Sequence, residues 1–257
     1  MVRHWILNRK WLALTILGML LPGPALADDN WQFRLTPYVW FAGIKGDVGT
    51  IPPLPTVPID VSPSDAVKDT EGGFMFMLDA KKQGQGFTLD FLYTDVQSDT
   101  TLVPAPINLN MKSTSKTTIA TLAYQHELYN RDGIVVDGLV GLRYWETDSE
   151  LQFSGGLGLL AGRSISNTES WVDPGVGIKG RTQFGKSRFY LEGGAGIGGF
   201  GVGSDLFYDL NVAVGYQWNK SIGTVIGYRM FDVDYENNGY VYDVRQQGWE
   251  LGITFAF

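Results

Sequence analysis

Apolar and polar residues alternate with a period of two along most of this chain. In the segment 205–218, every even position from Leu206 to Trp218 is apolar, while the odd positions include Asp209 and Asn211. Successive side chains of a β-strand point to opposite faces of a sheet. The alternation therefore predicts strands with one apolar face and one polar face.

Ten runs of this kind occur, and the segments that join them alternate between long and short. The predicted strands are Trp31–Phe41, Phe74–Lys82, Phe87–Val96, Thr117–Leu128, Ile134–Thr147, Trp171–Gln183, Arg188–Ile197, Asp205–Trp218, Ile222–Val233 and Val241–Phe257. The first long loop is the Pro-rich stretch Ala42–Gly73. Alternating long loops and tight turns indicate an up-and-down antiparallel meander with two distinct ends. Eight or twelve strands stay open, because residues 148–170 could add a hairpin.

The direction of the apolar face decides between two architectures. A soluble sandwich or lipocalin-like barrel buries that face, whereas a transmembrane barrel turns it to lipid and keeps polar side chains in the lumen. The strand lengths match the roughly 9–11 tilted residues that cross a bilayer. Aromatic residues lie at both ends of the apolar face: Trp31, Phe33, Phe87, Phe189, Trp218 and Phe257 toward the short turns, and Phe74, Tyr93, Tyr144 and Tyr208 toward the long loops. We therefore expect an all-β transmembrane antiparallel up-and-down β-barrel of about ten strands, with the soluble sandwich as the alternative.

The N-terminus has the features of a secretory signal peptide. Arg3, Arg9 and Lys10 precede the apolar run 11–21, and residues 25–27 (Ala-Leu-Ala) form a small-x-small cleavage site. The apolar run is shorter than the about 20 residues that a spanning helix needs. We expect a cleaved signal peptide at residues 1–27 and a single barrel domain at residues 28–257.

Composition narrows the possible chemistry. The 33 Gly in 257 residues are about 13%, against an average near 7%, and this abundance disfavours helices. The chain has no Cys, so disulfides, thiolate metal sites and Cys nucleophiles are excluded. The net charge of −7 argues against nucleic acid as a partner. No cofactor and no metal are expected.

The C-terminal strand resembles the assembly signal of Gram-negative outer-membrane barrels, which ends in an aromatic residue. Its alternating positions are Trp249, Leu251, Ile253, Phe255 and Phe257. Four further stretches resemble a largely uncharacterised family of small proteobacterial outer-membrane β-barrel proteins: 36–48 (TPYVWFAGIKGDV), 171–181 (WVDPGVGIKGR), 198–208 (GGFGVGSDLFY) and 227–245 (GYRMFDVDYENNGYVYDVR). The resemblance spans residues 31–257.

Membership in that family implies a location in the cell outer membrane and no agreed activity. The partners it implies are outer-membrane lipid and lipopolysaccharide, the barrel-assembly machinery and periplasmic chaperones. It does not specify an oligomeric state.

Odd and even positions of a strand point to opposite faces, so the position of each charged residue predicts whether it faces the lumen. The candidates for a lumen ion-pair network are Arg34, Asp79, Asp90, Asp137, Arg143, Asp173, Arg181, Glu192, Asp209, Arg229 and Glu250, with Lys81 and Lys179 beside them. Opposite charges in a narrow lumen are expected to pair, because an unpaired buried charge is costly. We expect Asp173 to pair with Arg143 on the neighbouring strand, and the lumen to be filled. Lumen-facing glycines either leave a narrow path or make room for neighbouring Arg side chains; these are Gly175, Gly177, Gly194, Gly196, Gly215, Gly227 and Gly252.

Catalytic arrangements are sparse in the sequence. His126 would remain after signal cleavage, and its place beside a short turn indicates an interfacial side chain rather than a catalytic base. Loop carboxylates could activate water or bind Ca²⁺; they are Asp205, Asp232, Asp234, Glu236 and Asp243. We expect a non-enzymatic outer-membrane barrel with long surface loops, acting as a narrow small-solute channel or in an envelope structural or binding role. The alternative is an outer-membrane hydrolase that uses those carboxylates.

Overall fold

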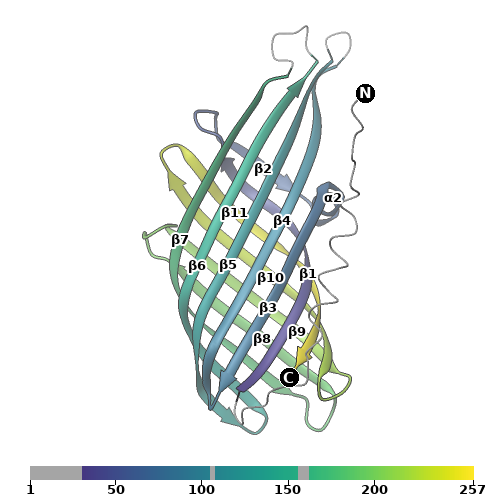
Figure 1. The fold of residues 1–257 in the computed structure, drawn as a ribbon, viewed down its shortest axis with the longest axis vertical. Coiled ribbons are helices and arrows are strands. Elements are labelled where there is room, and N and C mark those ends of the chain that lie inside the picture. The colour runs from purple at the N-terminus through teal and green to yellow at the C-terminus, as the bar shows by residue number, and fades with distance from the viewer. Residues whose placement is uncertain (1–30, 105–107, 156–161) are drawn as a thin grey trace, which may run out of the picture.

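The chain folds into a closed antiparallel barrel of ten strands (Figure 1). The computed structural model describes residues 31–104, 108–155 and 162–257, so the expected signal peptide lies outside the described residues. The barrel strands are β1 (Trp31–Gly49), β3 (Thr70–Lys82), β4 (Gln85–Val103), β5 (Leu109–Arg131), β6 (Ile134–Ser154), β7 (Ser164–Gln183), β8 (Phe189–Gly199), β9 (Leu206–Gln217), β10 (Ile222–Asn237) and β11 (Tyr240–Ala256). Each pairs with its neighbours in chain order, which confirms the predicted meander.

The first and last strands close the barrel. β1 runs antiparallel to β11 from Arg34↔Ala256 to Gly49↔Val241. At the end of this ladder, Phe33 and Phe257 exchange two backbone hydrogen bonds of 2.9 and 3.0 Å. Closure satisfies the backbone groups that an open sheet edge would expose to lipid.

Two kinds of connection separate the ends of the barrel. The short-turn end holds the β3–β4, β5–β6, β7–β8 and β9–β10 turns together with Phe257, and the other end is the long-loop end. At the β5–β6 turn, Asp132 and Gly133 have φ of 54° and 76°. Two positive φ values define the turn type that matches the twist of a hairpin, which explains the Asp-Gly pair.

Residues 148–154 and 164–170, which fall in the segment that could have added a hairpin, belong to the two strands on either side of it. They lengthen β6 and β7 instead, with ladder pairs from Asp148↔Thr168 to Gln152↔Ser164. β4 to β7 thus rise well above the rest of the barrel at the long-loop end (Figure 1). The predicted strand number was correct, but these four strands are longer than expected.

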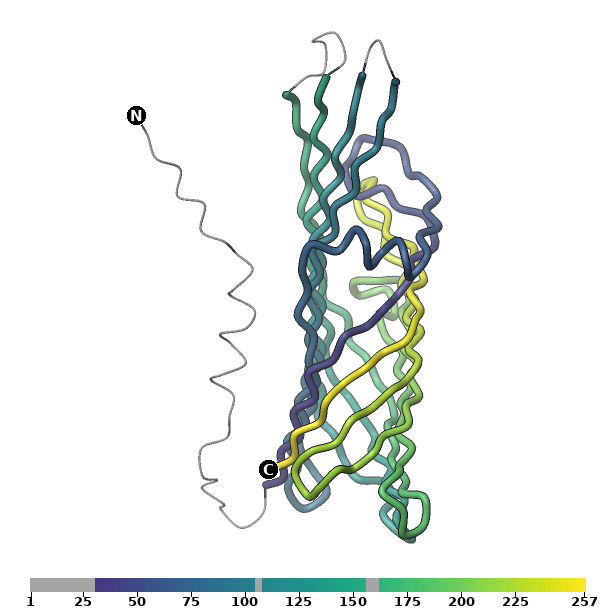
Figure 2. Tube along the Cα trace, turned by 90° about the vertical axis from the view of Figure 1, so that its right-hand side faces the viewer, coloured from purple at the N-terminus to yellow at the C-terminus, as the bar shows by residue number. Residues whose placement is uncertain are grey.

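The first long loop is partly structured, contrary to its prediction as a loop over Ala42–Gly73. β1 continues to Gly49 and pairs with the short strand β2 (Val57–Val61), which is followed by helix α2 (Pro63–Asp69). Ser62 caps α2 by accepting a hydrogen bond from the backbone N–H of Asp65. The β1–β3 ladder ends at Tyr38↔Met75, and above it β1 diverges from β3, with α2 crossing between them (Figure 2).

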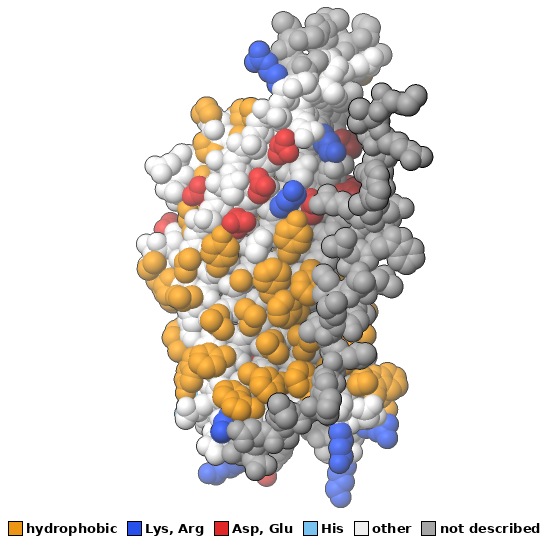
Figure 3. All heavy atoms as spheres, viewed as in Figure 1, with side chains coloured by type: hydrophobic (Ala, Val, Ile, Leu, Met, Phe, Trp, Pro, Cys, Tyr) orange, Lys and Arg blue, Asp and Glu red, His pale blue; other side chains and the backbone are white. Residues whose placement is uncertain are grey.

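Apolar side chains face outward and form a belt around the lower barrel (Figure 3). Leu122, Val140, Leu142, Ile226 and Leu251 are each at least 50% exposed. Exposed aromatic residues border the belt: Trp31, Phe87, Phe189, Trp218 and Phe257 at the short-turn end, and Phe74, Tyr144 and Tyr228 toward the long loops. A soluble sandwich would bury these side chains, so the structure excludes that alternative.

No helix in the described part of the chain is long and apolar enough to cross a membrane.

Candidate functional site: the lumen

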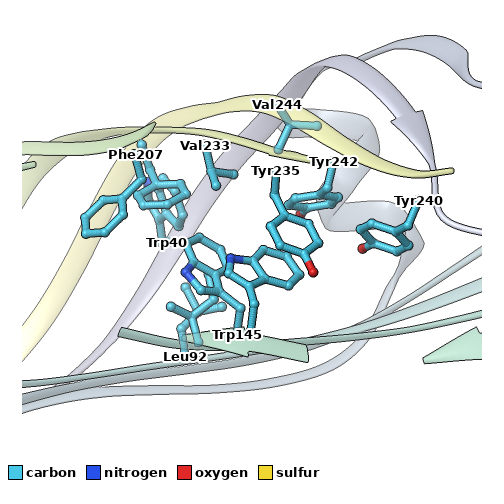
Figure 4. Close-up of a cluster of buried hydrophobic side chains, with 12 residues drawn as sticks. Trp40, Leu92, Trp145, Phe207, Val233, Tyr235, Tyr240, Tyr242 and Val244 are labelled. Carbon is cyan, nitrogen blue, oxygen red and sulfur yellow. The ribbon is translucent and has the colours of Figure 1, made fainter. Parts of the chain in front are cut away.

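The long-loop half of the lumen is filled by an apolar cluster, which we call the aromatic plug (Figure 4). Its members are Trp40, Leu92, Ile119, Trp145, Trp171, Phe207, Phe231, Val233, Tyr235, Tyr240, Tyr242 and Val244. They come from β1, β4, β5, β6, β7, β9, β10 and β11, so the plug joins most of the barrel wall.

Ring stacking holds the plug together across the lumen. Trp171 of β7 stacks on Tyr235 of β10 with ring centroids 3.9 Å apart and planes 6° apart. Trp145 of β6 stacks on Trp171 at 5.4 Å and contacts Phe231 of β10 at 5.0 Å. Such offset stacking adds to the stabilisation from burial. Trp145 is fully buried, as expected for a side chain in a packed core.

Directly below the plug lies a buried ion-pair network, the central network. Arg229 of β10 donates to Asp209 at 2.9 and 2.5 Å and to Asp90 of β4 at 2.7 Å. Arg143 of β6 donates to Asp209 at 2.8 Å and to the Thr121 hydroxyl at 2.7 Å. The charges compensate one another within a ring of strands, which offsets the cost of removing them from water.

The central network also packs on the plug. The guanidinium carbon of Arg143 lies 4.5 Å from the ring centroid of Phe207 and 5.0 Å from that of Phe231. The guanidinium of Arg229 lies 5.5 Å from the Trp40 ring. These cation–π contacts place the charges against the aromatic layer that closes the lumen.

Asp173 and Glu250 differ from the other predicted lumen acids. Asp173 does not pair with Arg143, although the two residues are register partners. Its carboxylate instead accepts hydrogen bonds from the Ser204 backbone N–H at 2.6 Å and hydroxyl at 2.8 Å, so both oxygens are occupied. Glu250 lies over Gly227 and lines the lumen, and no Lys or Arg nitrogen of the described residues lies within 4.0 Å of its carboxylate.

The short-turn half of the lumen is a cavity of about 1010 Å³. It extends from the central network to Asn130 and Lys220 in the short turns. Gly175, Gly177, Gly194, Gly196 and Gly252 line it. The expected filling of the lumen therefore applies only to the long-loop half.

Three ion-pair groups line this cavity. Lys81 contacts Asp137 at 2.6 Å and Glu127 at 3.0 Å. Lys179 of β7 pairs with Asp79 of β3 across the lumen. Arg34 and Arg181 share Glu192 at 3.8 and 3.9 Å. The predicted lumen residues other than Asp173 line the cavity, and Asp173 is fully buried.

Several lumen residues were not among the sequence candidates. Tyr38 donates to Asp90 at 2.7 Å and accepts from Arg229 at 3.0 Å, and Glu127 pairs with Lys81. The plug aromatics were missed as well. Their signal was available, because Trp145 has the same parity as Arg143 and Phe231 the same parity as Arg229.

The remaining candidates lie away from the lumen. His126 is exposed on the outer face of β5 near the short-turn end, as expected. Asp232 binds Arg245 at 2.8 Å on the outer face at the long-loop end, where Asp234 faces Asp243 across the β10–β11 ladder. The assembly-signal residues of β11, from Trp249 to Phe257, alternate with its lumen-facing positions. Within the described ranges no group of three or more His, Asp or Glu residues is arranged to hold a metal ion.

The barrel is similar to solved bacterial outer-membrane proteins. The outer membrane protease OmpT from Escherichia coli is 10% identical, with 89% of this chain and 97% of that chain covered and a TM-score of 0.54. Ail, the attachment invasion locus protein of Yersinia pestis, is 11% identical over 89% of this chain and 99% of that chain, with a TM-score of 0.35. No family model matches the sequence, and no curated protein matches it. The closed barrel with its outward-facing apolar belt is the fold of a transmembrane β-barrel, as in OmpT.

Proposed function

We propose that this protein is a non-enzymatic outer-membrane barrel that does not conduct solutes and has a binding role in the cell envelope. The observation that carries the proposal is the aromatic plug. Its rings stack across the lumen above the central network. In this proposal they seal the long-loop half of the lumen against water. Wide barrels conduct because their lumen stays open, whereas small barrels are filled by side chains.

Two surfaces remain for binding. The extended ends of β4 to β7 rise above the belt at the long-loop end, which is the cell exterior in barrels of this class. The cavity at the other end faces the periplasm. The partners we propose are outer-membrane lipid, lipopolysaccharide and the barrel-assembly machinery. We also propose that the chain belongs to a family of small proteobacterial barrel proteins.

The proposed absence of enzymatic activity is supported by where the candidate catalytic groups lie. OmpT is a protease, and the alternative for this chain is hydrolysis by the carboxylates near the β10–β11 loop. His126 lies at the opposite end of the barrel from those carboxylates, and the Asp232 carboxylate forms a salt bridge with Arg245. A base must lie within hydrogen-bond reach of the proton it removes.

Planar-bilayer recording of the refolded protein tests the proposal. We expect no steady open conductance at moderate voltage. The matched variant is Trp145→Ala combined with Phe231→Ala, which removes two rings from the centre of the plug and should produce a measurable conductance. A large, stable conductance of the unmodified protein would contradict the proposal, as would peptide or lipid hydrolysis by the refolded barrel.

A further inference from the structure

The four lumen arginines fall into two groups according to their hydrogen bonds. Arg229 donates to Asp209, Asp90 and Tyr38 from all three guanidinium nitrogens. Arg143 donates from two nitrogens. These two side chains are at most 9% exposed and act as structural cations.

Arg34 and Arg181 make far fewer hydrogen bonds to the described residues. Their Nη1 atoms lie 3.8 and 3.9 Å from the same Glu192 oxygen, which is beyond normal hydrogen-bond length. Arg181 donates one hydrogen bond, to Gln217 at 3.3 Å, and Arg34 donates none to the described residues. Most of the N–H groups on these two guanidinium groups therefore have no acceptor among the described residues.

The Arg181 side chain is held in place by an aromatic ring. Its guanidinium carbon lies 3.6 Å from the centroid of the Tyr190 ring. Tyr190 is 2% exposed and occupies the space that a side chain at Gly215 would fill. A stacked guanidinium loses little further freedom when it binds a planar anion, so the geometry is preorganised.

Within 4.0 Å, the arginine pair has one carboxylate for two positive charges. Two guanidinium groups face the single carboxylate of Glu192, whereas Lys81 and Lys179 each have their own acidic partners. Arg34, Arg181 and Glu192 all line the cavity, together with Gly196, where an added Cβ would meet no atom closer than 3.7 Å. A forked pair of N–H donors matches a carboxylate or a phosphate group.

We propose that Arg34 and Arg181 form a binding site for a small anionic molecule that carries a carboxylate or a phosphate group and enters the cavity from the periplasm. The molecule lies between the two guanidinium groups, on the side away from Glu192. This inference rests on the proposed binding role and gives its ligand class.

Calorimetric titration of the refolded barrel in uncharged detergent micelles tests the site. Inorganic phosphate is the probe in one arm and acetate is the probe in the other, and the tighter of the two identifies the head group. We expect saturable binding in at least one arm. Absence of saturable binding in both arms would overturn the proposal.

Four variants determine whether the arginine pair is responsible. Arg34→Gln and Arg181→Gln should each weaken binding at least about tenfold, because each removes a charge-assisted donor fork. Glu192→Gln should strengthen binding several-fold, because it removes the competing carboxylate. Lys220→Gln is the matched control, since it removes one positive charge from the same cavity mouth and should leave the affinity within about twofold.

Heat-modifiable migration on gels verifies that each variant is folded. If Arg181→Gln does not fold, the opposite shifts expected for Arg34→Gln and Glu192→Gln still test the site. Unchanged affinity in both of these variants would overturn it. Failure to bind by a non-conducting barrel would refute only the site, whereas a large conductance with intact anion binding would refute only the sealed lumen.

Discussion

Arg229 and Asp209 form a bidentate ion pair inside the barrel, with Nε and Nη2 of the arginine on the two oxygens of one carboxylate at 2.9 and 2.5 Å. The pair lies on neighbouring strands, and Asp209 also accepts from Arg143. Asp209 thus contacts both buried guanidinium groups, and Asp90 supplies the second negative charge through Arg229.

Asp209→Asn should therefore destabilise the barrel strongly. The substitution keeps the side-chain volume but leaves two buried cations undercompensated, and breaking a buried pair costs about 3–5 kcal/mol. Urea unfolding from lipid vesicles measures the loss. Asp60→Asn is the control, because the exposed Lys45–Asp60 pair should contribute less than about 1 kcal/mol. Equal unfolding midpoints for the two variants would contradict the role given to Asp209.

Ser204→Ala should loosen the loop between β8 and β9. The Ser204 hydroxyl donates to Asp173 and accepts from the Trp171 indole N–H at 2.9 Å. Its removal leaves two buried polar groups short of a partner, at a cost of about 1–3 kcal/mol. Hydrogen exchange of residues 199–206 should accelerate, while Ser164→Ala at the exposed start of β7 should leave it unchanged. Unaltered exchange in the first variant would show that the Ser204 hydroxyl does not fix the loop.

Gly215→Ala and Gly196→Ala form a matched pair of lumen substitutions. A Cβ at Gly215 would collide with the Tyr190 ring, so the ring and the Arg181 stacked on it must move. A Cβ at Gly196 meets only the Val176 carbonyl oxygen, at 3.7 Å. We expect a clear loss of thermal stability for the first variant and little change for the second, measured by heat-modifiable migration. The reverse order would contradict the packing described for Tyr190.

Asp234 gives the loop end of β10 a pH dependence. Partial burial and the nearby carboxylates of Asp243 and Asp205 raise the pKa of Asp234 above its usual value. The folded state therefore binds this proton more tightly than the unfolded state, and stability rises as the pH falls through the raised pKa toward the unfolded value. Asp234→Asn should stabilise the protein at pH 7 and remove part of this rise.

Thermal unfolding at pH 7 and near pH 4 measures the difference between the unmodified protein and Asp234→Asn. Other carboxylates titrate over the same range, so the comparison uses the change between the two proteins at each pH. Asp99→Asn on the extension of β4 controls for the loss of one negative charge. An identical pH response with and without Asp234 would refute the prediction.

Local pattern was sufficient to predict the fold. Strand order, the lipid-facing positions and the lumen-facing charges all follow from parity and from the alternation of turns and loops, as the placement of Leu251 outside and Glu250 inside illustrates. The lengths of β4 to β7 were underestimated because polar strands above a membrane lack apolar alternation. The ladders above the belt show that this polar sequence continues the strands, for example from Gln97↔Thr114 in β4–β5 and from Asp148↔Thr168 in β6–β7.

Contacts across the lumen could not be predicted in the same way. Strand register places Arg143 beside Asp173, yet the Arg143 guanidinium pairs with Asp209, three strands away. The Asp173 carboxylate accepts a hydrogen bond from the Ser204 hydroxyl instead. Long side chains select among several partners at similar distance, and strand pairing does not determine that choice. The plug was missed because the lumen-facing positions were interpreted as a face of charges and glycines, although Trp145 and Phe231 share it.

The exchange of hydrogen bonds between Phe33 and Phe257 has a consequence for assembly. It joins residues that are separated by almost the whole chain, so this contact has nearly the largest sequence separation that the chain allows. Until β11 docks on β1, both margins of the growing sheet carry amides that lipid cannot satisfy. Membrane insertion and barrel closure are therefore coupled. A chain that lacks its last strand is left with two unpaired, aggregation-prone sheet edges rather than with a slightly smaller barrel.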